Sequence, residues 1–257
     1  KAVIPVHLFG LCADMPALQR VVPDGVAIIE DAACAAGATL DGQPAGGLGT
    51  MACFSFHPRK SITTGEGGML TTDDSDLAET ANRLRNHGAS VSEEIRHHGP
   101  KPYLLPDFDV LGFNYRMTDL QGALGLVQLG KLDRFIAERD KWARWYCEAL
   151  ADIAWLQMPS IPGGYGHAWQ AFVTVVDEAS APAPRNDMME TLQEAGISTR
   201  PGTHAVTELG YYKDRLGLQS GQFNVASRLE QQSLALPLHN RMSAEDFAYV
   251  SETLHRI

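Results

Sequence analysis

Residues 51–70, MACFSFHPRKSITTGEGGML, place a buried strand, a single lysine and a glycine-rich turn in succession. Met51–His57 is short, apolar and aromatic, and Pro58 cannot donate to a sheet ladder, so we expect the strand to end there. Lys60 therefore lies just past a strand end. The three glycines that follow favour a tight reversal before Met69–Thr72 becomes extended again.

Lys60 is the candidate nucleophile of this stretch. An amine that is partly desolvated near other cations, here Arg59 and His57, loses its proton more readily and can attack a carbonyl group. The alternative is a solvated Pro-Arg-Lys bend without chemistry. A hydrolase built on Ser55 and His57 is a weaker alternative, because no nucleophile-elbow motif surrounds them.

Composition limits the function classes. With 257 residues, 44% hydrophobic and 20% charged, the chain can bury a large core. Its net charge of −10, from 31 acidic and 21 basic residues, argues against nucleic acid as a partner. The four cysteines form no CxxC pair, so we expect reduced thiols, a cytoplasmic protein and no metal site. No stretch is apolar enough to span a membrane.

The beginning of the chain alternates strands and helices. Ala2–Phe9 and Val26–Glu30 are predicted strands, and Met15–Val22 is a predicted helix behind Asp14. Apolar strands separated by helices indicate an α/β fold with a parallel sheet, in which ligands collect at the carboxyl ends of the strands. Because Lys1 leads straight into a strand, we expect the chain to start inside a domain.

Asp31 follows the second predicted strand. Before the small-residue run AACAAGA it would make a good helix N-cap. If it acts with Lys60, its carboxylate would instead pair with a heterocyclic ring nitrogen and keep that nitrogen protonated. Both interpretations stay open at this point.

The next third of the chain carries an outer helix at Asp74–His87 and then a long irregular stretch, residues 88–113. This stretch is basic around Arg96, which is typical either of a loop that meets a diphosphate or of a solvated loop. Thr118 with Gln121 forms a capping box. Arg116 and Asn114 precede it, and an arginine and an asparagine at a helix start suit either a cap or a phosphate.

The helix after Thr118 is predicted to be the longest. Its apolar residues recur at three- and four-residue steps, which predicts one helix of about 30 residues. Gly122, Gly125 and Gly130 each cost about 1 kcal/mol in a helix, so another backbone is expected to pack close to it, with a second subunit as one candidate.

The amino-acid composition changes after Asp152, where a stretch rich in proline and glycine leads into a predicted strand at Ala171–Asp177. We therefore predict two domains, residues 1–151 and a smaller α+β domain at residues 152–257. Its further predicted elements are a helix at Asn186–Ala195, a strand at Ile197–Arg200, and helices at Ala226–Ser233 and Ala244–His255. His204 is its one site candidate, against the alternative of an exposed loop residue.

Three stretches then carry a family resemblance: EDAACAAGA at Glu30–Ala38, CFSFHPRKSITTGEGGM at Cys53–Met69, and GFNYRMTDLQGALGLVQLGKLD at Gly112–Asp133. Together they resemble the pyridoxal-phosphate-dependent nucleotide-sugar aminotransferases of the DegT/DnrJ/StrS group. The resemblance implies fold type I, the aspartate aminotransferase-like arrangement with a three-layer αβα large domain and a smaller C-terminal α+β domain. The likeness weakens after Asp152.

The resemblance implies a role for each matching residue. Lys60 would form the imine with pyridoxal 5'-phosphate, and Asp31 would pair with its ring nitrogen. Ser55 would bind the phosphate in its own subunit, and Asn114 would reach the phosphate of a neighbouring subunit, so the active unit would be a homodimer with shared sites. Arg116, His204 and Arg96 would contact the nucleotide sugar.

The sequence departs from the family pattern in two places. Position 34 is Cys34, where the resemblance leads us to expect Gln or His against the ring hydroxyl, and a thiol is a weaker hydrogen-bond partner. The family also carries an N-terminal segment ahead of Ala2 that helps to cup the phosphate and stack on the ring. We expect this chain without it to bind the cofactor weakly and to associate.

The implied reaction moves an amino group from a donor, by resemblance glutamate, through the cofactor to a keto sugar on a nucleotide, in cell-surface polysaccharide or amino-sugar biosynthesis. Two alternatives remain. A sugar dehydratase would have histidine in place of Lys60. A non-catalytic pyridoxal-phosphate-binding regulatory protein, or an inactive fragment, would keep the cofactor without turnover.

Overall fold

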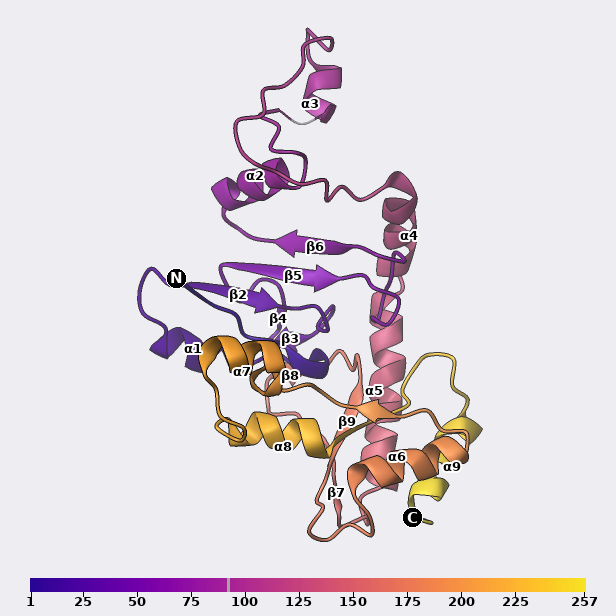
Figure 1. The fold of residues 1–257 in the computed structure, drawn as a ribbon. Coiled ribbons are helices and arrows are strands. Elements are labelled where there is room, and N and C mark those ends of the chain that lie inside the picture. Colours follow the sequence, from indigo (N-terminus) through magenta and orange to yellow (C-terminus); the bar gives the residue numbers. More distant parts are fainter. Residues whose placement is uncertain (92) are drawn as a thin grey trace. The chain divides into compact units, whose positions relative to one another are not determined.

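The computed structural model describes residues 1–91 and 93–257, which form two compact units. The first unit comprises residues 1–8 and 12–132, and the second comprises residues 9–11 and 133–257. Figure 1 labels the helices and most of the strands, coloured along the sequence from indigo to yellow.

The first unit is built on a four-stranded sheet in the order β1-β2-β5-β6. Its strands are β1 (Ala2–Val3), β2 (Ala27–Asp31), β5 (Met51–Ser55) and β6 (Gly68–Thr71). The first three are parallel, as the alternation of strands and helices predicted, whereas β6 returns antiparallel to β5 as a hairpin. Because β2 and β5 are parallel, their carboxyl ends lie at one edge, with Asp31 in register with Cys53.

The strand predicted at Ala2–Phe9 is shorter in the structure. After β1 the chain makes only an isolated parallel bridge from Val6 to Asp31, and then a 3₁₀ turn at Leu8–Gly10. Phe9 has a φ of 61°, which is incompatible with an extended strand. The bridge still ties this segment to the carboxyl end of β2.

The helices of the first unit begin where their capping residues predict. They are α1 (Met15–Val21), α2 (Ser75–Leu84), α3 (Glu93–His98) and α4 (Asp119–Leu129), and a short hairpin joins β3 (Thr39–Leu40) to β4 (Gln43–Pro44). Asp14 caps α1, Asp74 caps α2, and Thr118 forms the predicted capping box with Gln121. Helix α3 lies inside the stretch that was predicted to be irregular.

The single long helix predicted after Thr118 is wrong. Helix α4 ends at Leu129, and α5 (Leu132–Ala149) begins after a turn at Gly130 and Lys131. Glycine has a low helix propensity, so Gly130 is a natural place for the break. The close backbone approach expected at the glycines is also not formed within the described chain: nothing lies within 4 Å of a Cβ built on Gly122, and Gly125 faces the side chain of Thr64.

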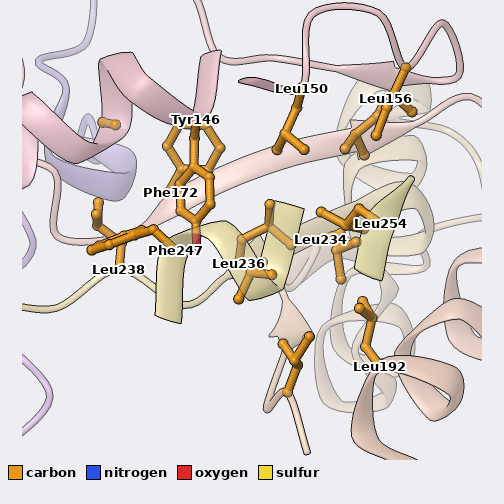
Figure 2. Close-up of a cluster of buried hydrophobic side chains, with 14 of the residues drawn as sticks. Tyr146, Leu150, Leu156, Phe172, Leu192, Leu234, Leu236, Leu238, Phe247 and Leu254 are labelled. Carbon is orange, nitrogen blue, oxygen red and sulfur yellow. The ribbon is translucent and has the colours of Figure 1, made fainter. Parts of the chain in front are cut away.

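Helix α5 packs with the second unit. The helix contributes Ala143 and Tyr146, and the residue that follows it contributes Leu150, to a buried cluster that also contains Phe172 and Phe247. Figure 2 shows Tyr146, Phe172 and Phe247 together in this cluster. The boundary between the compact units therefore falls between Leu132 and Asp133, earlier than the change at Asp152 that the sequence indicated.

The second unit is an α+β unit around an antiparallel sheet in the order β10-β11-β9-β7. Its strands are β7 (Leu156–Gln157), β8 (Tyr165–Gly166), β9 (Phe172–Val176), β10 (Arg200–Pro201) and β11 (Ser233–Leu236). Its helices after α5 are α6 (Arg185–Glu194), α7 (Gly210–Leu216), α8 (Asn224–Gln232) and α9 (Ala244–Leu254), with a 3₁₀ turn at Val206–Glu208.

Most predicted elements of this unit are confirmed, but of the strand predicted at Ile197–Arg200 only Arg200 lies in a strand, β10. Ser233, however, was predicted as the end of a helix and instead begins β11, the central strand beside β9. Helix α7 was not predicted. Across the described residues of both units, no helix combines the length and the apolar character needed to cross a membrane.

Candidate active site

Residues 57–66 form the loop that carries Lys60, and hydrogen bonds to Phe56 hold the two ends of this loop together. The Phe56 carbonyl accepts from Thr64 N (3.0 Å) and from Thr63 Oγ1 (2.9 Å), and its amide donates to Gly67 O (2.9 Å). A Cβ on Gly67 would clash with Thr64 Oγ1, and the φ of 152° also favours glycine there. Lys60 is thus presented by a short loop with both ends fixed on β5 and β6.

Lys60 Nζ lies 3.2 Å from Cys34 Sγ. Both side chains are half-buried, and Cys34 belongs to the turn that follows β2. The amine lies at the carboxyl edge of the sheet and has no carboxylate partner in the described chain. Its contact with Cys34 is weak, because a thiol is a weak hydrogen-bond acceptor. From the sequence, Arg59 and His57 were expected to lie beside the amine. In the structure the His57 ring is turned to its own loop, where its Nδ1 accepts a hydrogen bond from the backbone amide of Arg59.

Asp31 is not a helix N-cap. Residues 32–38 form turns rather than a helix, and Asp31 Oδ1 accepts from Ala33 N at 3.1 Å, two residues on. Ala32 and Ala35 are fully buried, so packing rather than helix propensity determines the conformation of residues 32–38. No described group donates to Oδ2 of Asp31. Burial and the negative charge of Asp31 raise the pKa of the neighbouring Cys53 thiol.

Behind Asp31 lies a buried polar cluster, the Glu30 cluster, that sequence reasoning missed. Glu30 is fully buried, and its carboxylate accepts from Leu48 N and Gly49 N (both 2.7 Å), from Gly46 N (2.8 Å) and from His7 Nε2 (2.8 Å). The only sequence signal was an acidic residue inside an apolar strand, which already requires buried donors.

His7 acts as a neutral donor in the Glu30 cluster. Its Nδ1 accepts from Ala13 N at 3.1 Å, which puts the ring proton on Nε2, facing Glu30. The amide of His7 also donates to Asp31 O at 3.0 Å. The cluster therefore fixes the backbone on which Asp31 is carried.

Ser55 ends β5 opposite Gly68, and its Oγ accepts from the amide of His57 at 3.3 Å. The hydroxyl proton of Ser55 remains available to an anion. The contact of His57 with Ser55 Oγ is made by the backbone amide of His57 and not by its ring. This arrangement does not support the Ser55–His57 hydrolase.

The structure places the other candidates of the first unit on exposed chain. Asn114 forms an isolated bridge with Asn86, and Arg116 Nη1 donates to Asn86 Oδ1 at 2.8 Å. Arg96 lies in α3, where its Nη2 is 3.4 Å from His97 Nε2. Lys60 and Cys34 are thus in contact, and Asp31 precedes the turn that carries Cys34, whereas no described hydrogen bond joins Arg116 or Arg96 to these residues.

His204 belongs to the second unit, in the loop between β10 and the 3₁₀ turn. Its side chain is 78% exposed, and its Nδ1 lies 3.7 Å from Glu230 Oε1. This distance is long for a hydrogen bond, so the ring is free to meet a ligand.

Comparison with known proteins identifies the family. The model of the DegT/DnrJ/EryC1/StrS aminotransferase family matches residues 1–255. The chain belongs to this family. The resemblance drawn from the three sequence stretches is thereby confirmed, and so is the fold type I, mixed α/β class. The family is dependent on pyridoxal phosphate.

Solved structures of other proteins superpose on all or nearly all of the chain. The aminotransferase TlmJ of Streptoalloteichus hindustanus is 26% identical, with a TM-score of 0.85, over 100% of this chain and 65% of its own. DesV of S. venezuelae, in complex with a ketimine intermediate, is 28% identical with a TM-score of 0.85 over 100% of this chain and 64% of its own. A Streptococcus pneumoniae structure in its PLP form is 26% identical with a TM-score of 0.87, over 98% and 67%. The chain thus spans about two thirds of the length of these relatives.

The residues present suit the family's cofactor. A primary amine without a carboxylate partner, a carboxylate with one oxygen unbonded, and a serine hydroxyl with its proton free all belong to one sheet edge. These are the groups that an aldehyde, a protonated ring nitrogen and a phosphate each require.

Proposed function

We propose that this family member is a pyridoxal-phosphate-dependent aminotransferase that transfers an amino group, from glutamate as donor, to a keto sugar attached to a nucleotide. The observation that supports it most directly is the Lys60 amine, 3.2 Å from Cys34 Sγ on the turn that also carries Asp31. We place the reaction in cell-surface polysaccharide or amino-sugar biosynthesis, in the cytoplasm. When bound, the cofactor supplies an electron-accepting ring.

Lys60 does two things in this proposal. Its Nζ would hold the cofactor, and once the donor amine has displaced it, the free amine would accept the proton that leaves the α-carbon of the donor. In the second half of the transfer the same amine would supply the proton that the acceptor carbon gains. In the described chain the amine contacts a thiol and no carboxylate, so no ion pair has to break before it attacks the cofactor. A carboxylate partner would instead hold the amine in its charged form.

Asp31 would keep a proton on the ring nitrogen of the cofactor. Its Oδ1 is oriented by Ala33 N, which leaves Oδ2 to accept from the ring N–H. In this scheme Cys34 would take the place of the family's partner for the ring hydroxyl, and Ser55 Oγ would donate to the phosphate. These roles are carried over, residue by residue, from the resemblance of the three sequence stretches.

The rest of the site requires a second subunit. In this proposal Asn114 reaches the phosphate of the neighbouring protomer, with Arg116 beside it, and Arg96 and His204 contact the nucleotide sugar. Helix α4 supports a homodimer because none of its residues is buried, and Leu120 and Leu126 are 85% and 75% exposed. Such an apolar helix face is typical of a subunit contact.

The test is the absorbance spectrum of the protein with pyridoxal phosphate, followed by borohydride reduction and peptide mapping. We expect a visible imine band, with the label on Lys60, and loss of the band in Lys60→Ala. Lys131→Ala is the matched control and should keep it. A label on Lys131 or Lys101 would refute the assignment.

Addition of glutamate separates the enzyme from the alternative, a cofactor-binding regulatory protein. Conversion of the imine band to the amine form supports amino transfer, whereas a band that persists supports the binding protein. The dehydratase remains disfavoured because Lys60 is present.

A further inference from the structure

The second unit contains a cavity of about 280 Å³ between α5 and the segment that follows β11. Its walls combine charged, aromatic and apolar side chains: Glu138, Arg139, Lys141, Trp142, Leu238, His239, Asn240 and Met242. At about 30 Å³ per water in the liquid, this space corresponds to roughly nine waters, which suits a small organic molecule.

Arg139 places a positive charge in the wall of this cavity. Its side chain is buried, with Nε donating to Asn240 Oδ1 and Nη1 to the carbonyl of Trp169, and more weakly to those of Gln170 and Leu238. No carboxylate of the described residues lies within salt-bridge distance of the guanidinium. Its Nη2 has no hydrogen-bond partner in the described chain, so two donors on a buried cation remain unused.

Glu138 is the opposite charge on the same wall. Its Oε2 accepts from Asn240 Nδ2 at 2.7 Å, and Oε1 has no partner in the part of the chain that the structure describes. Asn240 is fixed between the two charges because its Nδ2 also donates to Phe135 O. The asparagine therefore holds the carboxylate and the guanidinium side by side without letting them pair with each other.

The remaining walls are rigid and largely apolar. Trp142 stacks on Phe247 with ring centroids 4.2 Å apart, and Lys141 Nζ lies 4.9 Å from the Trp142 ring centroid. Leu238 and Phe247 belong to the buried cluster drawn in Figure 2. The Nδ1 of His239 accepts from the amide of Arg241, so that nitrogen is not free for a ligand.

From this arrangement we propose that the cavity binds a free α-amino acid. The carboxylate of the ligand would take the free Nη2 donors of Arg139, reinforced by Lys141, and its ammonium group would donate to Oε1 of Glu138. An anion alone would be repelled by Glu138, and a cation alone by Arg139. The apolar walls formed by Trp142, Leu238 and Met242 favour an aliphatic side chain.

The test uses L-leucine and two analogues that each lack one charge, isovalerate without the ammonium group and isoamylamine without the carboxylate. Binding is followed by the NMR shift of the Met242 methyl group in the protein without cofactor, so the result does not depend on Lys60. We expect saturation by leucine with a Kd of about 1 mM or tighter, and at least tenfold weaker binding of each analogue.

Glu138→Gln is the decisive variant, because the glutamine oxygen can still accept from Asn240. It should weaken leucine binding about tenfold, while isovalerate should bind at least as well as before. Glu148→Gln, on the same helix but outside the cavity, should change neither. Arg139→Lys should weaken leucine and isovalerate together.

Three results would overturn the proposal: no saturable Met242 shift with leucine up to about 50 mM, equal binding of the three probes, or an unchanged preference in Glu138→Gln.

Discussion

Replacing Glu30 by glutamine should destabilise the first unit severely. The carboxylate accepts four hydrogen bonds, two on each oxygen. Glutamine has one acceptor oxygen and one NH₂ group, so at least two donors lose their acceptor and face another donor instead. At 1.5–3 kcal/mol for each hydrogen bond to a charged group, the loss is about 3–6 kcal/mol. That is a large fraction of the stability of a typical domain.

The same substitution should remove an acid-dependent part of the stability. Burial alone would raise the pKa of Glu30, but the hydrogen bonds from His7 and from the amides of Gly46, Gly49 and Leu48 outweigh it and lower the pKa below its ordinary value. A carboxyl with a lowered folded-state pKa stabilises the protein above its unfolded pKa, and this stabilisation is lost as the pH falls through the folded-state value. The variant should lack this acid-sensitive component.

Urea unfolding at pH 7 and pH 4, with hydrogen exchange at the amides of Leu48 and Gly49, measures both effects. Glu79→Gln, on the exposed face of α2, is the matched control and should change stability by less than about 0.5 kcal/mol. A loss below about 1 kcal/mol in Glu30→Gln, with unchanged exchange at both amides, would show that the Glu30 cluster does not hold this loop.

Four further outcomes are expected. Asp31→Asn should retain the imine band but lower turnover about a hundredfold, because the charge that holds the ring proton is lost; unchanged steady-state kinetics would leave Asp31 with only its turn-forming role. Thr118→Ala should cost about 1 kcal/mol through loss of the α4 cap, read as a lower melting temperature. Phe247→Ala should cost about 3–5 kcal/mol in urea unfolding, because the ring is fully buried. His255 has a raised pKa, from hydrogen bonds to the Ser251 carbonyl and to the Asp152 carboxylate, so its stabilising contribution should be complete below pH 6.5 and fade as the pH rises through the folded-state value; a stability profile of His255→Gln that still shows this fading would contradict it.

Short-range signals predicted the beginnings of the elements well. Asp14, Asp74 and Thr118 each stand where a helix starts, since a cap depends only on the next few residues. The parallel pairing of β1 with β2 also followed from the alternation of strands and helices. Such features need no knowledge of distant contacts.

Features that depend on distant contacts were not predictable. The turn after Asp31 resembles a helix by composition, but the burial of its alanines decides otherwise. The contact between Lys60 and Cys34 joins residues 26 positions apart, and it exists only because β2 and β5 are neighbours. The sequence identified Lys60, Asp31 and Ser55 as candidates, yet the Glu30 cluster that supports Asp31 gave no periodic signal.

The loop that carries Lys60 has a consequence for how relatives of this chain can differ. Both of its ends are hydrogen-bonded at one residue, Phe56, so the distance that the chain must cover between Phe56 and Gly67 is fixed. One added residue would have to bulge, and the lysine amine would move away from the sheet edge. We therefore expect residues 57–66, apart from Lys60, to vary among relatives by exchange of side chains at constant length, and insertions to occur outside them.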